Sequence, residues 1–236
     1  MEYLLDDPIS ESNYQEILRK IRLLQNGEVA DSMRQRGVVY KLNLGASVIS
    51  LQQLAAQYQP DHLLALKLWN KQWRETMILA TLLEKPYEVT ENQMDFWVKQ
   101  IQHIEIAEQV AMNLFSKTPC AYEKAMEYCL GKKNLSKITG LLMMGRLALT
   151  DRSASNERFE TFFELFPPLA KDPHLSLIFN RVFLQIAMRN PDLYEFALQQ
   201  AHLLMTLDSA VAKENAESLI GHLEDEAVRE MVAKRI

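Results

Sequence analysis

The sequence predicts an all-α protein built from stacked antiparallel helix pairs. Hydrophobic residues make up 48% of its 236 residues, while the chain holds only 7 glycines and 8 prolines. So few helix-breaking residues in a chain of this length predict long, closely spaced helices. Strand patterns are scarce, because the short alternating stretch GVVYKLNLG at 37–45 has no second run with which to pair. We expect that stretch to be a helix or a connector.

Apolar residues repeat with a helical period along most of the sequence. In chain order, this period predicts helices around residues 17–24, 51–58, 77–83 and 196–204. Helix-turn-helix units of this size cannot bury their own apolar faces, so we expect them to stack as a HEAT-like (ARM-type) α-solenoid. No linker-like stretch divides the chain, which predicts a single domain over residues 1–236. Segments that combine helix stops with N-cap residues lie at 58–62, 84–92, 116–120, 130–136, 149–157, 166–174, 189–192 and 207–210.

The charge balance limits what the chain as a whole attracts. With 31 acidic against 26 basic residues and a formal net charge of −5, the chain has no global attraction to nucleic acid or to anionic membranes. Nucleic-acid binding would need a local patch, and residues 117–152 are the best candidate. Lys132 and Lys133 follow Gly131 at an expected helix end, where the helix dipole alone favours cations, so a phosphate-facing patch and an ordinary helix end both stay open. The basic residues of the stretch are Lys117, Lys124, Lys132, Lys133, Lys137, Arg146 and Arg152.

Several functional classes lack their sequence signatures. The 5 histidines are scattered and no C-x-x-C or H-x-x-x-H spacing occurs, so no metal and no cofactor is expected. Glycine-rich nucleotide-binding loops and the esterase G-x-S-x-G elbow are missing as well. Cys120 and Cys129 fall on opposite faces of one expected helix and cannot pair within it. Without a signal-peptide pattern or an apolar run near the roughly 18 residues of a membrane span, the simplest interpretation is a reduced cytoplasmic protein with no membrane partner.

Two carboxylates stand out in QIQHIEIAEQVAMNL, residues 100–114, which we expect to be one amphipathic helix. On a helical wheel Glu108 falls among apolar neighbours, whereas Glu105 falls at the edge of that surface and is expected in solvent. A carboxylate on an apolar face is costly to bury unless it is partnered or used. Glu108 is therefore either paired with a cation at the core margin or part of a chemical site.

Aromatic residues suggest packing more than binding. Trp69 and Trp73 are expected to be core anchors at a helix junction, although exposed tryptophans could also stack on bases. The phenylalanines of RFETFFELFPPL, residues 158–169, are expected to pack in the core.

Four stretches together resemble one known family. They are GASVISLQQLA at 45–55, LWNKQWRETMILATLL at 68–83, QIQHIEIAEQV at 100–110 and RNPDLYEFAL at 189–198. Within them, Leu51, Leu54 and Ala55 match an early family motif. These stretches resemble the DNA alkylation repair enzyme family, the HEAT-like glycosylases that excise positively charged alkylated purines. The resemblance spans most of residues 40–200.

The resemblance implies a site around Glu108. That residue occupies the position of the family's catalytic aspartate, which stabilises the developing cationic sugar or positions the attacking water. His103 and Ile104 stand where the family has paired tryptophans, Thr139 falls near the position of its site arginine, and Arg181 near that of a later tryptophan. The resemblance thus implies duplex DNA as partner, with base excision by Glu108 altered or lost. The implied DNA contacts are Lys132, Lys133, Lys137 and Arg181, converging with Glu108 on one face.

A second hypothesis is a non-catalytic helical-repeat scaffold that binds a protein or a nucleic acid. It predicts scattered basic residues and a Glu108 neutralised in a structural ion pair.

Overall fold

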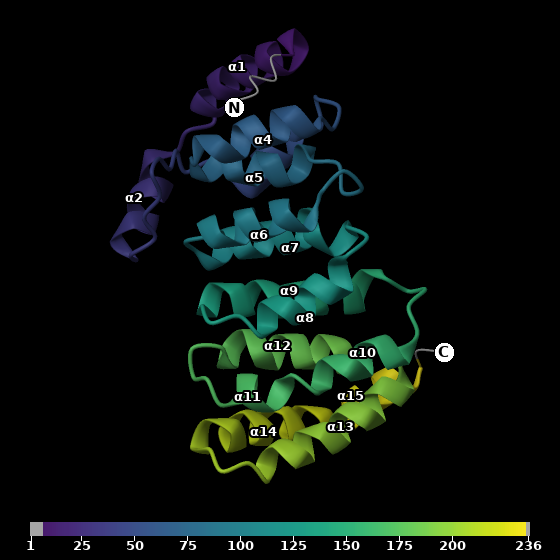
Figure 1. Ribbon diagram of the computed structural model, residues 1–236. Coiled ribbons are helices and arrows are strands. Elements are labelled where there is room, and N and C mark those ends of the chain that lie inside the picture. Colours follow the sequence, from purple (N-terminus) through teal and green to yellow (C-terminus); the bar gives the residue numbers. More distant parts are fainter. Residues whose placement is uncertain (1–6, 235–236) are drawn as a thin grey trace. The chain divides into compact units, whose positions relative to one another are not determined.

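The computed structural model describes residues 7–234, and every regular element in this range is a helix (Figure 1). Successive helices pack as antiparallel pairs, which confirms the predicted all-α class. The chain divides into two compact units, Met1–Pro119 and Cys120–Ile236. Each unit has a core of its own, and the single domain expected over residues 1–236 stays a prediction.

The first unit is organised around α5. This helix pairs with α4 and also packs on α3 and α7, while α1 covers α4. Helix α2 stands away from the other helices of this unit in Figure 1, and none of its residues is buried. The elements are α1 (Pro8–Leu23), α2 (Gly27–Gln35), α3 (Val48–Ala55), α4 (His62–Lys71), α5 (Arg74–Leu83), α6 (Glu91–Gln100), α7 (Ile104–Asn113) and the 3-10 turn η1 (Phe115–Lys117).

The second unit is organised around α12. This helix packs on α9, α13 and α14, while α8 pairs with α9 and α13 pairs with α14. The elements are α8 (Ala121–Cys129), α9 (Asn134–Thr150), α10 (Asn156–Phe163), α11 (Phe166–Ala170), α12 (Ser176–Ala187), α13 (Pro191–Met205), α14 (Ala210–Leu223) and α15 (Glu226–Ala233).

Aromatic rings anchor both cores. In the first unit Trp69 of α4 is fully buried and stacks on Trp97 of α6, with ring centroids 4.0 Å apart and an interplanar angle of 2°. This confirms the core role expected for Trp69. In the second unit Phe163, Phe166 and Phe183 meet edge to face or tilted, at centroid distances of 4.9 to 5.6 Å. Ring pairs of this kind stabilise the fold by about 0.5–1.5 kcal/mol each, beyond the stabilisation that comes from burying their surface.

The helix starts follow the expected N-cap chemistry. At about half of the described helices a side-chain oxygen of the N-cap residue accepts a hydrogen bond from a backbone N–H in the first turn, which satisfies a donor that the helix itself leaves open. The N-cap residues that do so include Asn26, Ser47, Asp61, Thr90, Asn190, Ser209 and Asp225.

Three local expectations are settled by the structure. Residues 100–114 are not one helix, because α6 ends at Gln100 and α7 begins at Ile104 after a turn. The segment FPPLA, expected among the helix stops, forms the short helix α11 with proline in its first turn, where the missing N–H costs nothing. The stretch 37–45 is a connector between α2 and α3, which confirms the second of the two alternatives for it.

Candidate nucleic-acid interface

One edge of the first unit gathers helix ends that lie far apart in the sequence. Helix α4 ends at Gln72, its C-cap, and α5 starts after Trp73. The Gln72 Nε2 atom donates to Gln100 Oε1 at 3.3 Å, which places the end of α6 and the start of α7 beside this junction. The backbone N–H of Arg74 donates to the Leu42 carbonyl at 2.9 Å, so the connector also reaches it. We call this surface the turn edge.

The turn edge carries cations around an aromatic ring. Lys71 Nζ lies 4.8 Å from the centroid of the Trp73 ring, and Arg22 Cζ, at the end of α1, lies 5.8 Å from it. Trp73 is half-buried, so the sequence-based expectation of a core anchor is wrong for this residue. Lys41 in the connector and Lys99 at the end of α6 are exposed nearby. An indole with two cations over it can offer both charge and a stacking surface to a nucleic acid.

The opposite edge of the first unit is acidic. The backbone N–H of Asp61 donates to the Leu83 carbonyl at 2.8 Å, which joins the start of α4 to the end of α5 there. Lys85 on this edge forms an ion pair with Glu88 at 2.9 Å. The two edges therefore differ in sign, which a net charge alone does not reveal. The carboxylates of the acidic edge are Asp61, Glu84, Glu88 and Glu91.

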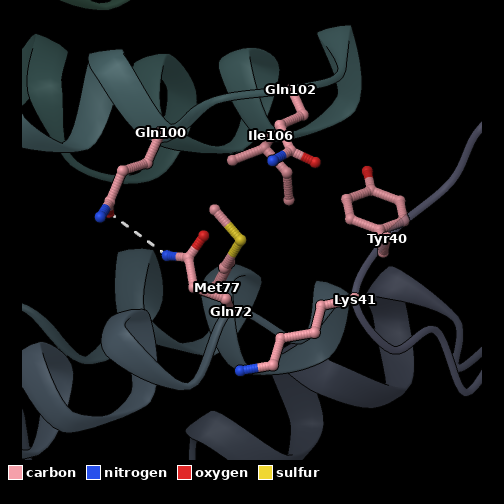
Figure 2. A pocket seen from close by; sticks show the side chains of 7 residues that line it. All are labelled: Tyr40, Lys41, Gln72, Met77, Gln100, Gln102 and Ile106. Atoms are coloured by element: carbon pink, nitrogen blue, oxygen red, sulfur yellow. Dashed lines mark hydrogen bonds between the residues drawn. The ribbon is translucent and has the colours of Figure 1, made fainter.

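A pocket of about 220 Å³ opens at the turn edge (Figure 2). Its apolar lining comes from Met77 of α5 and Ile106 of α7. The polar lining comes from the connector and the two helix junctions, and Figure 2 shows the Gln72 carbonyl oxygen turned toward the space that Met77, Ile106 and Gln102 border. The seven lining residues are Tyr40, Lys41, Gln72, Met77, Gln100, Gln102 and Ile106.

Hydrogen bonds fix the Gln72 amide in one orientation. Its Nε2 donates to the Trp69 carbonyl at 2.9 Å as well as to Gln100 Oε1, which also accepts from Trp69 Nε1 at 2.5 Å. Gln72 also holds a left-handed backbone, with φ 59° and ψ 29°. That conformation costs an L-residue about 1–2 kcal/mol. Strain of this kind gathers at functional sites, which makes Gln72 a residue of interest.

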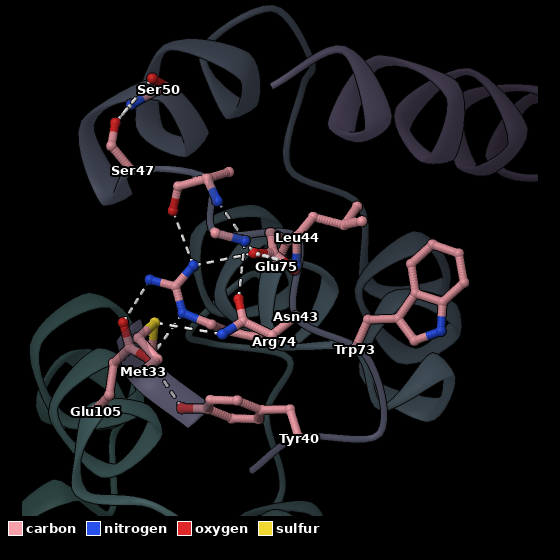
Figure 3. A network of polar contacts seen from close by, with 12 residues as sticks. Met33, Tyr40, Asn43, Leu44, Ser47, Ser50, Trp73, Arg74, Glu75 and Glu105 are labelled. Carbon is pink, nitrogen blue, oxygen red and sulfur yellow. Dashed lines mark hydrogen bonds and ion pairs between the residues drawn. The ribbon is translucent and has the colours of Figure 1, made fainter. Parts of the chain in front are cut away.

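A network of polar contacts around Arg74 joins the connector to α5 and α7 (Figure 3). Its Nη2 donates to Glu105 Oε1 at 2.6 Å and its Nε donates to Glu105 Oε2 at 2.8 Å, a bidentate pair. Its Nη1 donates to the Ala46 carbonyl at 2.8 Å and to Glu75 Oε1 at 3.0 Å. Tyr40 donates its hydroxyl proton to Glu105 Oε2 at 2.8 Å. The connector is therefore held by its side chain at Tyr40 and by its backbone at Ala46.

Glu75 completes this network from within the core. Its side chain is fully buried and accepts from the backbone N–H of Leu44 at 3.2 Å and of Ala46 at 3.3 Å. Arg74 is 5% exposed, so one guanidinium and two carboxylates share a site that is largely closed to water. Charges in such a site are stable only while each has its partner.

Titration of the network follows from these contacts. Burial raises the pKa of Glu105, but the hydrogen bonds and charge of Arg74 outweigh it, and the pKa lies below its ordinary value of 4.5. Burial opposes the Arg74 charge, yet the Glu105 carboxylate raises the pKa of Arg74 above normal. Burial and then the Glu105 charge raise the pKa of Tyr40. Near neutral pH the network is an ion pair with a neutral phenol as a further donor.

The two carboxylates of the 100–114 stretch have different environments. The expectation that Glu105 is solvated is wrong, since its side chain is 25% exposed and bound to Arg74 and Tyr40. The helical wheel treated residues 100–114 as one continuous helix. In the structure a new helix begins after the turn at 101–103, and Glu105 in its first turn points toward Arg74 of α5. Glu108 lies three residues further along α7 and is half-buried.

The predicted DNA contacts all lie in the second unit. Lys132 and Lys133 are exposed in the turn between α8 and α9, and Lys133 is the N-cap of α9. Lys137 Nζ lies 3.7 Å from an Asp172 carboxylate oxygen, which brings the start of α9 beside the turn before α12. Arg181 is exposed on α12. Because Glu108 belongs to the first unit, the convergence of these four residues with Glu108 stays a prediction.

Residues 7–234 contain neither a metal-binding cluster nor a membrane span. In that range no three His, Cys, Asp or Glu side chains are grouped closely enough to hold a metal ion. No helix there combines the length and the apolar character that crossing a membrane requires.

Stacked antiparallel helix pairs define a helical-repeat protein. The chain belongs to the DNA alkylation repair enzyme family, whose model matches residues 17–173, and this confirms the resemblance found in the sequence. No curated protein matches the sequence significantly.

One solved structure supports the HEAT-like fold. It comes from a family described as related to the HEAT-like repeat DNA glycosylases, with affinity for branched DNA structures. The TM-score is 0.73 over 93% of this chain and 96% of that chain, at 15% sequence identity. At that identity the similarity establishes the fold alone, and it confirms the predicted HEAT-like class.

Only part of the turn edge is signalled in the sequence. Arg74 and Glu75 directly precede the mostly apolar stretch TMILATLL, residues 76–83. Two charged residues at the start of a helix that is otherwise apolar are the one signal of a buried ion pair here. Lys41, Lys71 and Lys99 stand too far apart in the chain for a local charge count to group them.

Proposed function

We propose that this protein binds branched DNA, with phosphates contacting Arg22, Lys41 and Lys71 at the turn edge of the first unit. Lys132, Lys133, Lys137 and Arg181 are the proposed duplex contacts of the second unit. The observation that carries the proposal is the half-buried Trp73 ring with Arg22 and Lys71 over it, in a chain of net charge −5. Family membership and the branched-DNA affinity described for the structural relative support it.

The chemistry of the turn edge suits a branch point. Lysine and arginine bind phosphates and release counterions, which makes binding sensitive to salt. An aromatic ring stacks on bases of any identity, worth about 1–3 kcal/mol per base, but only where a base is not already stacked in a duplex. Bases at a branch point meet that condition more readily than bases within an intact helix.

The test is fluorescence anisotropy with a three-way junction and a duplex of equal length, at about 50 and 200 mM salt, a range over which phosphate contacts are lost. We expect tighter binding to the junction. The double variant Arg22→Ala/Lys71→Ala should lower the slope of log affinity against log salt by about 1.8, since each phosphate contact contributes about 0.9. Lys85→Ala on the acidic edge is the matched control. Equal affinity for junction and duplex, or a double variant indistinguishable from Lys85→Ala, contradicts the proposal.

Excision of alkylated purines is the second candidate function, and in it Glu108 would be the catalytic carboxylate. The residue is half-buried in α7 at the position that resembles the family's catalytic aspartate. At the positions of the family's paired tryptophans, His103 Nε2 contacts the Val39 carbonyl at 2.6 Å and its ring lies edge-on to Tyr40, with centroids 4.6 Å apart. This imidazole is engaged with the connector, and Ile104 has no π face, so a cationic base lacks its aromatic partners here. We therefore rank DNA binding ahead of excision.

Excision is tested by base release from a duplex that contains N7-methylguanine. If Glu108 is catalytic, the wild type releases the base and Glu108→Gln does not, while both bind DNA equally. Absence of release by the wild type removes this candidate. Absence of any DNA binding at low salt removes both, and a protein-binding scaffold is then the remaining function.

A further inference from the structure

We infer that the pocket at the turn edge holds one unpaired nucleobase from a DNA branch point, with Gln72 accepting from an N–H group of its Watson–Crick edge. Gln102 contacts the neighbouring atom of that edge, and Lys41 faces the phosphate at the mouth. This inference rests on the proposed function, since it names what the branch point places in the pocket.

The size of the pocket favours a single ring system. Its volume of about 220 Å³ lies below the range of roughly 300–1,000 Å³ typical of sites for drug-sized ligands. A base pair or a folded peptide segment is therefore too large. Met77 is 4% exposed and Ile106 is fully buried, so these side chains close the apolar floor of the pocket, and the half-buried Tyr40 is the lining ring beside which a flat ligand can lie.

The Gln72 amide defines what the ligand must offer. Because its Nε2 is committed to Trp69 and Gln100, the atom left for a ligand is the carbonyl oxygen, which only accepts. No donor to this oxygen is found among the side chains of residues 7–234. A carboxylate or a phosphate placed in the pocket would meet an acceptor and be repelled, whereas the amino group of adenine or cytosine meets a partner.

The other polar residues complete a base-sized set. Gln102 is exposed, and its amide can donate to the ring nitrogen next to the amino group. Lys41 is exposed at the mouth. A ring with an amino group beside a ring nitrogen and a phosphate a few bonds away is the pattern of a nucleotide.

The pocket distinguishes unpaired from paired bases. In a duplex the Watson–Crick edge is already hydrogen-bonded and the base is stacked, so flipping it out has a cost. An unpaired base at a branch point avoids most of that cost. The left-handed backbone of Gln72 fits this role, because glycine would adopt the same turn without strain but could not offer an amide oxygen.

The experiment compares three-way junctions that differ only at the branch point: one unpaired adenine, one N6,N6-dimethyladenine or one abasic site. We expect adenine to raise affinity about tenfold over the abasic junction, a change of about 1.4 kcal/mol. Dimethyladenine keeps the ring but has no N–H to donate, so it should bind as the abasic junction does.

The decisive variant is Gln72→Gly, since glycine keeps the left-handed turn and the melting temperature should be unchanged or higher. It should bind the three junctions equally, at the affinity of the wild type for the abasic one. Gln53→Ala, an exposed glutamine on α3, is the matched control and should keep the tenfold preference.

Each outcome is decisive. If the wild type binds all three junctions equally, or if Gln72→Gly keeps the preference for adenine, the base pocket is wrong while branched-DNA binding stands. If the wild type binds no junction, the proposed function and the base pocket are both wrong.

Discussion

Arg74 is the residue on which the connector depends. It is the cation that forms ion pairs with both Glu75 and Glu105, and all three side chains are largely out of water. Such groups contribute little net stability as a set, but removing one member leaves the others uncompensated.

Replacing Arg74 with methionine should therefore be costly. The side chain stays long and unbranched but leaves two carboxylates without their cation, and the expected loss is about 3–5 kcal/mol of unfolding free energy. Chemical denaturation measures it. The matched control is Arg34→Met, where the lost partner is Asp31 in an exposed ion pair at 2.7 Å and the change should stay below about 1 kcal/mol. Equal losses in both variants would mean that the buried network is not what holds this region.

Glu105 should make stability depend on pH. Its folded-state pKa lies below the ordinary value of 4.5, so in acid the unfolded chain binds its proton first. The stabilisation is therefore fully present above about pH 5 and is lost as the pH falls through the lower, folded-state pKa.

The variant Glu105→Gln isolates this contribution. We expect it to melt well below the wild type at pH 7 and to approach the wild type as the pH falls through the folded-state pKa of Glu105, because the wild-type carboxyl is then protonated too. Thermal unfolding across that range measures the gap. A gap that stays constant with pH would show that the loss comes from shape and not from charge.

At the scale of elements, the connector is fixed at a close backbone approach. Gly45 has φ +72°, and a Cβ placed on it would lie 2.1 Å from the Asn26 carbonyl oxygen. Asn26 caps α2 and also donates its N–H to the Leu44 carbonyl at 2.7 Å. Glycine is therefore required there both by conformation and by space.

Gly45→Ala and Gly37→Ala separate these two causes. Gly37 has φ +81° but nothing within 4 Å of the place that an added Cβ would occupy, so alanine there should cost only the left-handed conformation, about 1–2 kcal/mol. Gly45→Ala adds a backbone clash and should cost clearly more. Denaturation midpoints compare the two, and equal costs would show that the approach to Asn26 relaxes freely.

The helices could be predicted from sequence, but two turns could not. The spacing of apolar residues located α3, α5 and α13 because burial imposes that period. The junction at Gln72 has neither glycine nor proline, and the turn at 101–103 ends at His103, whose side chain makes no capping bond. Tertiary contacts accompany both breaks, namely the bond of the Arg74 N–H to the Leu42 carbonyl and the Glu105 pair with Arg74. Both unsignalled turns lie at the turn edge, where local preference is overridden by the site.

At the scale of the molecule, net charge conceals how charge is distributed. The total of −5 argues against nucleic acid, yet the first unit separates an acidic edge from one with Arg22, Lys41, Lys71 and Lys99. The sequence alone pointed to residues 117–152 because basic residues outnumber acidic ones in that continuous stretch. The turn edge stayed hidden because its cations come from three separate helix ends and one connector, and only folding brings them together.

Two substitutions that change the net charge equally test whether the distribution of charge or the total charge governs DNA binding. Lys71→Glu and Lys85→Glu each subtract two charges and take the chain from −5 to −7. The two lysines lie at opposite edges, separated by the 10 residues of α5, a rise of about 15 Å, which exceeds the Debye length of about 8 Å at physiological salt.

Lys71→Glu should therefore weaken junction binding about tenfold or more, while Lys85→Glu changes it less than about twofold. Anisotropy at about 150 mM salt compares them. Equal weakening would mean that the protein repels DNA as a whole and that the turn edge is not the interface, whereas the expected asymmetry assigns the contact to the edge that holds Trp73 and the pocket.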